Sequence, residues 1–515
     1  MKYTSNNFNT RKVCVFMEKD YPVNYPEFII PKADGVTDSE KKLIRLGYQS
    51  FFSLWSYPNP YRKHNLDKEL CDLLVIFGDD IIIFSDKDIA FPLEGNIKTN
   101  WRRWYRKAIT KSCNQLCGAM SWLKKYPDRI ALDPKGEVDF PLNIQVTTRT
   151  RFHLVSVVHG IKDACINYFD GGDGGLVIDN FTPPNAHLSD NCEPFRIGTI
   201  NNDTSNFIHV FDDASYALVL EELNTIQDFI DYLEDRKQFL LTSKKIQATG
   251  ECEILAIHLD AAIHGKKNGL TQLLTKDYGS FLLDEGLWDE FTASTAYINW
   301  KKQTKISYFW DDLLKRTIEY IEKGQTFHTS HPTIDGQSKL LYQMAKANRY
   351  RRARLSEGIL SFFCNTPKDK RGTRIIMSQE DPNIAFVLLL LPKPNDVPYE
   401  EYRSIRGEML SDYCAITKAD HPELLHVFGI AHATIGMNDD SEEFAYLDAT
   451  YWTNEDHEKA LHLKQEYADH GLLAERTATR IKRRMPEFAV KGKDRNKPCP
   501  CGSGIKYKKC CGRNS

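Results

Sequence analysis

The fold of the N-terminal half is decided by residues 69–88, which read ELCDLLVIFGDDIIIFSDKD. Two apolar runs, Leu70–Phe77 and Ile81–Phe84, are separated by the turn-forming residues 78–80, a pattern typical of a β-hairpin. Charged residues occupy the far ends of both runs. Because the two strands of a hairpin lie side by side, this sequence predicts a group of charged side chains at one end of a sheet.

Two registers of this hairpin are compatible with the sequence. A two-residue turn of Asp79–Asp80 places Asp72 opposite Lys87, whereas a turn that also includes Gly78 places Asp72 opposite Asp86. In either register, carboxylate and ammonium groups meet at the same end of the sheet. The hairpin is therefore the first candidate for a functional site.

Helical patterns flank the hairpin on both sides. Residues 37–40 read Thr-Asp-Ser-Glu, which is typical of a helix start, and apolar residues follow at near-helical spacing. After the hairpin, a stretch rich in tryptophan and arginine predicts a helix over 101–125, ended by Pro127. Extended patterns then resume within residues 142–158.

This order of elements resembles the core of the PD-(D/E)xK nucleases, in which a helix, a strand and a hairpin carry a glutamate, an aspartate and an acidic-x-Lys sequence. The resemblance assigns these roles to Glu40, Asp72 and Lys87. It implies a restriction-endonuclease-like mixed sheet and phosphodiester hydrolysis with Mg²⁺ or Mn²⁺. In that chemistry carboxylates hold the metal, and the lysine orients water or stabilises the charge of the transition state.

One position departs from the family pattern. The residue two before Lys87 is Ser85, where the family has an acid, so either the adjacent Asp86 replaces that acid or the site holds metal poorly. A simpler alternative is that Asp72, Asp86 and Lys87 form salt bridges at a solvated strand end. The helix after the hairpin supplies four cations suited to phosphate contacts: Arg102, Arg103, Arg106 and Lys107.

Four of the 13 cysteines lie within 13 residues near the C-terminus: Cys499, Cys501, Cys510 and Cys511. Four thiolates match the tetrahedral coordination of Zn²⁺ in closed structural sites. So short a segment buries no core, and metal binding would supply most of its folding free energy. The alternative, two disulfides, is disfavoured because the other nine cysteines are scattered as in a reduced protein.

This segment resembles the SEC-C motif, the zinc-binding tail of the protein-translocation ATPase SecA that also occurs on unrelated bacterial proteins. Both cysteine pairs, the Gly-Ser-Gly turn at 502–504 and the Tyr-Lys at 507–508 carry the resemblance. The chain contains no Gly-x-x-x-x-Gly-Lys-Ser/Thr loop, so the resemblance does not extend to the SecA motor. It implies a portable module that docks a partner.

Composition sets the broad class of the protein. Of 515 residues, 41% are hydrophobic and 27% are charged, as in a soluble globular protein with full-sized cores. The balance of 68 basic and 70 acidic residues excludes a generally basic nucleic-acid coat. The apolar run Ala385–Leu391 is far shorter than the ~20 residues of a membrane span, and the N-terminus lacks the apolar core of a signal peptide. We therefore expect a cytoplasmic protein without a membrane span.

The sequence predicts an α+β multidomain protein of five segments. Charge changes sharply near the end, since residues 471–515 contain 13 Lys and Arg against 3 Asp and Glu. The predicted segments are a nuclease-like α/β domain at 1–185, a mainly helical middle at 186–345, a mixed α/β region at 346–470, a basic linker at 471–493 and the SEC-C module at 494–515.

Two functions are compatible with these features. The first is a metal-dependent nuclease recruited through its zinc tail, with a role in bacterial defence by analogy with other uses of such cores. The second is a non-catalytic adaptor whose tail docks a chaperone, a ribosome or another protein. Convergence of Glu40, Asp72 and Lys87 beside a basic groove would favour the nuclease, and an exposed apolar or acidic docking face would favour the adaptor.

Overall fold

The computed structural model describes residues 32–63, 68–200, 206–322, 334–378, 381–434, 441–473, 496 and 506–509. The chain forms two compact units. The larger unit draws on Ile30–Lys315 and Leu341–Ala353, and the smaller unit draws on Arg316–Leu340 and Arg354–Arg480. Both contain a mixed sheet and helices, which confirms the α+β multidomain class.

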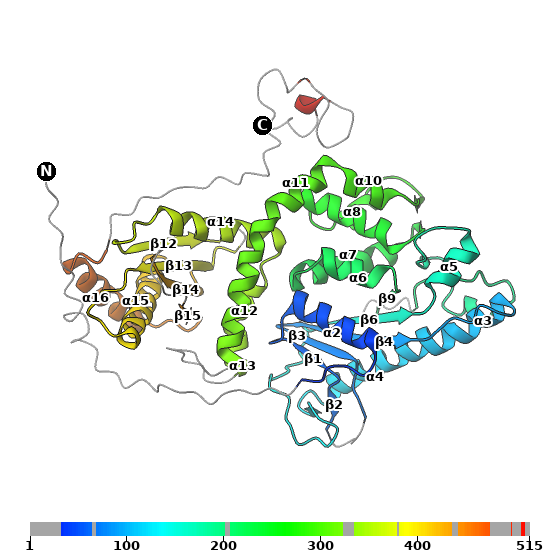
Figure 1. The fold of residues 1–515 in the computed structure, drawn as a ribbon, viewed down its shortest axis with the longest axis horizontal. Coiled ribbons are helices and arrows are strands. Elements are labelled where there is room, and N and C mark those ends of the chain that lie inside the picture. The colour runs from blue at the N-terminus through cyan, green and yellow to red at the C-terminus, as the bar shows by residue number, and fades with distance from the viewer. Residues whose placement is uncertain are drawn as a thin grey trace. The chain divides into compact units, whose positions relative to one another are not determined.

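A five-stranded mixed sheet forms the centre of the larger unit, with the strand order β1-β3-β4-β6-β9 (Figure 1). The first three strands are antiparallel, and β6 and β9 continue parallel to β4. The last strand, β9, lies beyond residue 185, the predicted end of the first domain. The sheet therefore includes strands from both sides of that predicted boundary. The strands are β1 Ser56–Pro58, β3 Leu73–Phe77, β4 Asp80–Asp88, β6 Arg151–His159 and β9 Ile208–Phe211.

The predicted hairpin is present as β3 and β4, but both predicted registers are wrong. Phe77 pairs with Asp80, so the turn consists of Gly78 and Asp79. Gly78 has a φ of +60°, in the left-handed region that glycine adopts without the steric cost of a Cβ atom. The tight turn therefore forms at the glycine and not at the following pair of aspartates.

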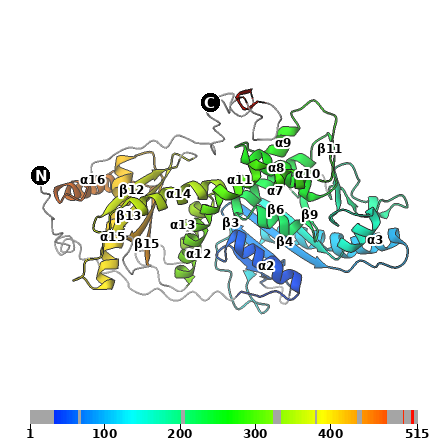
Figure 2. The same cartoon turned by 45° about the horizontal axis from the view of Figure 1, so that its top comes forward.

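Helices cover both faces of this sheet. On one face, the ring of Phe84 stacks on Phe51 of α2 and Phe229 of α7, at centroid distances of 6.0 Å each. Figure 2 shows α2 lying across β3 and β4. On the other face, α4 packs against β4 and β6. The helices around this sheet are α2 Asp38–Phe51, α3 Ile97–Tyr105, α4 Lys111–Lys125, α5 Lys162–Phe169, α6 Ser215–Glu222 and α7 Ile226–Leu240.

The helix predicted over 101–125 is longer and not uniform. It runs from α3 into α4 through one π-helical turn, η1 (Arg106–Thr110). A π turn holds about one more residue than an α turn and therefore changes which side chains share a helix face. This segment forms the crossover between β4 and β6, and it positions both Gln115 and the predicted phosphate-binding cations.

A second sheet of the larger unit has the order β11-β10-β7-β8. Its strands are β7 Val177–Asp179, β8 Arg196–Ile197, β10 Lys245–Ala248 and β11 Ser280–Leu283, and a separate pair is formed by β2 Tyr61–Arg62 and β5 Ile130–Ala131. The remaining helices up to residue 322 are η2 Ala186–Leu188, α8 Glu251–Ile263, α9 Gly269–Leu273, α10 Leu287–Ala293, α11 Thr295–Thr304, η3 Lys305–Ser307 and α12 Tyr308–Glu322.

The smaller unit contains a four-stranded sheet with the order β12-β13-β14-β15. The parallel pair β13 and β14 is connected by α15, and the buried Arg406 of this helix pairs with Glu443 of β15. The strands are β12 Gly372–Met377, β13 Ile384–Leu391, β14 His426–Ala433 and β15 Glu442–Asp448. The helices after α12 are α13 Ile334–Ala345, α14 Arg349–Asn365, α15 Tyr399–Asp420 and α16 Asn454–Asp469, with a short turn η5 at Tyr507–Lys509.

The helices of the described residues have no membrane-spanning candidate. None of them combines the length and the apolar character that crossing a bilayer requires.

We expect Gly78→Ala to destabilise the larger unit by about 1–3 kcal/mol, because left-handed backbone disfavours a Cβ atom and this atom would lie 2.6 Å from Cε2 of Tyr342. Urea unfolding followed by tryptophan fluorescence measures this loss, since every tryptophan except Trp452 belongs to the larger unit. Gly286→Ala is the control, because its φ is +97° but no atom lies within 4 Å of the added Cβ. Equal losses in both variants would contradict the role of Tyr342.

Candidate functional site

Three of the predicted site residues lie on one face of the first sheet. The pairing of Leu73 with Phe84 places Asp72 opposite Ser85, one step further along the hairpin. Alternate residues of a strand share a face, so Lys87 lies on the same side as Ser85. The ammonium of Lys87 lies 3.2 Å from Oδ2 of Asp72. The structure thus brings Asp72, Ser85 and Lys87 together.

Gln115 of α4 completes this group and was not predicted from the sequence. Its Nε2 donates to Oδ1 of Asp72 at 3.0 Å, and its Oε1 accepts from the hydroxyl of Ser85 at 2.9 Å. The amide therefore connects Ser85 of β4 with Asp72, which directly precedes β3. We call Asp72, Ser85, Lys87 and Gln115 the α4-face site.

The Asp72 carboxylate is buried, with only 4% of the residue exposed. Burial raises the pKa of this carboxyl group, because a charged form is poorly solvated there. The Lys87 ammonium, the Asp86 backbone N–H and the Gln115 amide act in the opposite direction by stabilising the carboxylate. Three donors thus hold this group in place.

Asp86 faces the other side of the sheet. Its Oδ2 accepts from the hydroxyl of Ser39 at 2.5 Å, and its Oδ1 lies 2.7 Å from Nε2 of His159. The other ring nitrogen of His159 lies 2.9 Å from Oδ1 of Asp213. Because neighbouring residues of a strand point to opposite faces, the Asp86 side chain does not replace the acid that is absent at Ser85.

His159 is held between two carboxylates. Burial alone would lower the pKa of its imidazole, but the hydrogen bonds and charges of Asp213 and Asp86 raise this pKa to about 9. The ring of Tyr216 packs edge-on against it, with the centroids 5.1 Å apart. His159 is therefore protonated at neutral pH and joins the ends of β4, β6 and β9. No local sequence pattern indicates this group, since the bonded residues lie more than 50 positions apart.

Glu40 acts as a helix cap. Its carboxylate accepts from the backbone N–H of Val36 at 2.7 Å and forms a capping box with Thr37, which confirms the predicted helix start. A second acid, Glu69, is half-buried near the site. Burial raises its pKa, and the charges of Asp72 and Glu40 raise it further, so these three acids are close enough to interact electrostatically.

The carboxylates do not form a metal centre among the residues that the structure describes. No group of three or more His, Cys, Asp or Glu side chains in those ranges is placed to hold an ion. On the α4 face, the position of the second acid carries the neutral Ser85 hydroxyl, and three donors already occupy the Asp72 carboxylate. With a single carboxylate that is already bound by three hydrogen-bond donors, the α4-face site as placed does not fit Mg²⁺.

The four predicted phosphate-binding residues differ in their surroundings. Arg102 pairs with Asp190 at 2.6 Å. By contrast, Arg103, Arg106 and Lys107 are exposed and form no ion pair with a described residue. Their charges are available to an anion at this surface.

A line of three cations leads along this helical segment to the α4-face site. Arg103, Lys107 and Lys111 are exposed and precede Gln115 at four-residue intervals. In a regular α-helix each residue turns by about 100°, so two residues twelve positions apart differ in direction by about 120° after three full turns. The extra residue of the π turn reduces this difference by about 100°. The three cations and Gln115 therefore follow nearly one line on the helix surface.

The four cysteines of the tail, Cys499, Cys501, Cys510 and Cys511, lie outside the described residues. Between them, Tyr507–Lys509 forms one 3₁₀ turn, in which Lys509 N donates to the carbonyl of Lys506 at 2.8 Å.

Comparison with known proteins identifies this tail. Residues 495–513 match the model of the SEC-C motif, a zinc-binding motif. Segments of protein translocase subunit SecA are similar: 66% identical over 32 residues in Thermodesulfovibrio yellowstonii, covering 6% of this chain and 4% of that protein, and 90% over 20 residues in Carboxydothermus hydrogenoformans, covering 4% and 2%. In Aliarcobacter butzleri the identity is 48% over 44 residues, or 8% and 5%.

These matches confirm the SEC-C resemblance of the tail. The chain spans about a twentieth or less of the length of the curated relatives it matches. No solved structure matches the chain. The resemblance of the larger unit to PD-(D/E)xK nucleases stays a prediction.

The paired state of His159 predicts a pH dependence of stability. Because folding raises the pKa of His159, its stabilising contribution is complete below about pH 6.5 and is lost as the pH rises through about 9. We expect the free energy of unfolding to fall over this interval, by at most about 3 kcal/mol. Urea midpoints from tryptophan fluorescence between pH 6 and 9.5 measure the change. In His159→Gln this fall should largely disappear, and an unchanged profile would contradict the assignment.

Proposed function

We propose that the larger unit is a nuclease-like domain that binds the phosphodiester backbone of nucleic acids at the α4-face site. The observation that carries this proposal is the 3.2 Å contact between Asp72 and Lys87 on one face of the hairpin. The strand directions around it support the proposal, since an antiparallel hairpin is followed by a helical crossover into a parallel strand. Asp72 and Lys87 stand at the positions at which the PD-(D/E)xK pattern has its aspartate and lysine.

The surface chemistry agrees with a polyanionic ligand. Arg103, Lys107 and Lys111 form a line of exposed cations that ends at Gln115, beside Asp72. Lys and Arg side chains that neutralise phosphates release counterions and so favour association. In this arrangement the cations orient the backbone along the helix, and Lys87 binds a phosphate at the end of the line.

Hydrolysis with Mg²⁺ or Mn²⁺ is the second candidate function, and the Asp72–Lys87 pair favours it. In the related chemistry, the bound metal stabilises the charge that develops at the phosphate. Ser85 stands where the second carboxylate is needed, and Asp86 faces away, so the residues as placed do not supply that site. Phosphodiester binding is therefore the function that the geometry supports best.

For the tail, we propose that Cys499, Cys501, Cys510 and Cys511 bind one Zn²⁺ and that the folded tail docks a partner of the protein. The donor set fits, because four thiolates satisfy tetrahedral zinc. The SEC-C match supports this assignment. In the alternative adaptor role, the same tail docks a chaperone, a ribosome or another protein, and the protein does not bind nucleic acid.

We expect nucleic-acid binding to depend on Lys87 and Lys107. Fluorescence anisotropy with labelled single-stranded and duplex DNA, in EDTA and at one fixed salt concentration, should show a loss of about fivefold in affinity for Lys87→Ala and for Lys107→Ala, since a charge-assisted contact contributes about 1 kcal/mol or more. Lys302→Ala, an exposed lysine of α11, is the matched control.

The same variants separate the candidate functions. Nicking of a supercoiled plasmid in Mg²⁺ or Mn²⁺ that is lost in Asp72→Asn would extend the function to hydrolysis. Binding that depends on Lys87 without any nicking would restrict the function to recognition. If no nucleic acid binds, or if Lys302→Ala weakens binding as much as Lys87→Ala does, the proposal is contradicted and the adaptor role is favoured.

We expect the full chain to contain one zinc ion. Metal analysis of the purified protein should give about one zinc per chain, and Cys510→Ser should lose it because three thiolates hold the ion less tightly. Cys364→Ser is the control, since Cys364 is exposed and lies outside the tail. Zinc content that is independent of Cys510 would contradict the assignment.

A further inference from the structure

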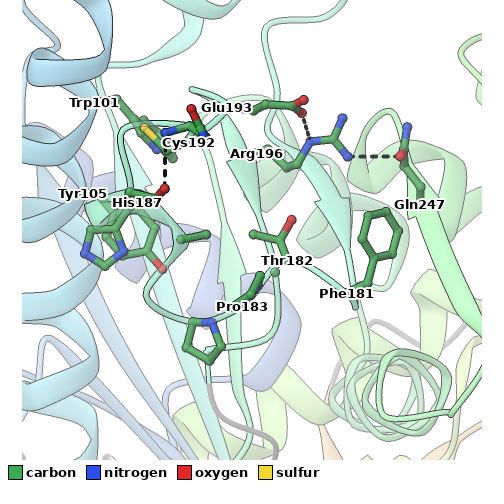
Figure 3. Close-up of a pocket in the computed structure, with 15 residues that line it drawn as sticks. Trp101, Tyr105, Phe181, Thr182, Pro183, His187, Cys192, Glu193, Arg196 and Gln247 are labelled. Atoms are coloured by element: carbon green, nitrogen blue, oxygen red, sulfur yellow. Dashed lines mark hydrogen bonds and ion pairs between the residues drawn. The ribbon is translucent and has the colours of Figure 1, made fainter.

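A cavity of about 570 Å³ opens between α3 and the segment that follows β7 (Figure 3). Its volume falls within the range of about 300–1,000 Å³ that is typical of small-molecule sites. The α3 residues of its wall lie on the helical segment that carries Arg103 and continues into Arg106 of η1, but the cavity shares no residue with the α4-face site. None of its residues was singled out from the sequence.

Aromatic rings form much of the cavity wall. The rings of Tyr105 and His187 stack at 3.9 Å with an interplanar angle of 14°, and the buried Trp101 lies one helical turn before Tyr105. Phe181 also lines the cavity, yet 46% of this residue is exposed. Lys245 lies 6.0 Å from the centre of the Phe181 ring and can cover only one of its faces. The wall is suited to a flat ring stacked against the other face.

Arg196, a cation in the cavity wall, is paired with neighbouring residues. Arg196 is already bound by Glu193 at 2.7 Å, by Asp179 at 3.1 Å and by Oε1 of Gln247 at 3.0 Å. Its charge is thus compensated by two carboxylates. Gln247 accepts the hydrogen bond of Arg196 through its side-chain oxygen. Its amide nitrogen makes no hydrogen bond to a described residue and is available as a donor.

Burial lowers the pKa of His187, and the charge of Arg102 lowers it further. Its imidazole is therefore neutral at pH 7, and the stacked Tyr105–His187 pair adds no net charge to the cavity. A neutral, planar ligand with hydrogen-bond acceptors on its edge matches this combination of aromatic surfaces and an amide donor.

We propose that this cavity binds one unpaired base of a single-stranded nucleic acid, stacked on Phe181 and hydrogen-bonded to Gln247. This inference rests on the proposed function and deepens it, because it makes the single strand the preferred substrate form. Arg106, directly after Tyr105 in the chain, is exposed and forms no ion pair with a described residue, and in this proposal it contacts the adjoining phosphate. A base within a duplex is held in its own stack and enters such a cavity only after unpairing.

The test is anisotropy of the full-length protein, in EDTA, with a labelled thymidine 12-mer, a duplex of equal length and a 12-mer of abasic deoxyribose phosphates. Loss of one stacked base by alanine substitution costs about 5- to 150-fold in affinity. We expect Phe181→Ala to weaken binding of the thymidine 12-mer by at least fivefold and to leave binding of the duplex and of the abasic 12-mer unchanged. Gln247→Ala should show the same selectivity with a smaller loss.

Phe169→Ala is the matched control, because Phe169 is exposed to 45% but does not line the cavity. Equal effects of Phe181→Ala and Phe169→Ala, or equal losses with the thymidine and abasic 12-mers, would overturn the inference while leaving the proposed function intact. Unchanged DNA binding in Phe181→Ala would also overturn the inference, and it is the result expected if the cavity instead binds an aromatic side chain of a protein. Absence of binding to all three probes would instead contradict the proposed function.

Discussion

The buried carboxylate of Asp72 is the constraint on which the arrangement of the larger unit depends. A carboxylate removed from water is stable only where donors replace its solvation. Here the donors come from the backbone of Asp86, the ammonium of Lys87 and the amide of Gln115. The first two belong to β4 and the third to α4, so one group fixes the position of the hairpin relative to the helix that crosses it. The cations of α3 and η1 are aligned with the site through the same helix.

The alternation of side chains along β4 divides its polar residues between two tasks. Ser85 and Lys87 face α4, where they belong to the candidate binding site. Asp86 faces the opposite side, where it joins His159 and Asp213. This group connects the ends of β4, β6 and β9, which lie far apart in the sequence. The backbone N–H of Asp86 also donates to Asp72, so the group helps to position the α4-face site. Three consecutive polar residues thus combine a chemical and a structural role.

Local patterns in the sequence predicted local structure well. The hairpin and the capped helix start at Thr37 are present, because each depends on residues within a few positions of one another. The register was wrong by one or two residues, since the choice of Gly78 for the turn depends on backbone conformation. Gln115 and His159 were missed because their partners lie 43 and 73 positions away in the chain. The four cysteines of the tail form a compact motif, which is why sequence alone identified the SEC-C resemblance.

The most direct measurement of the central claim is a crystal structure of the full chain with a bound single-stranded oligonucleotide. The account predicts a phosphate within hydrogen-bond distance of Lys87 Nζ, with the backbone continuing along Lys107 and Arg103. An oligonucleotide that binds at a different surface, with Lys87 still paired only to Asp72, would contradict the account.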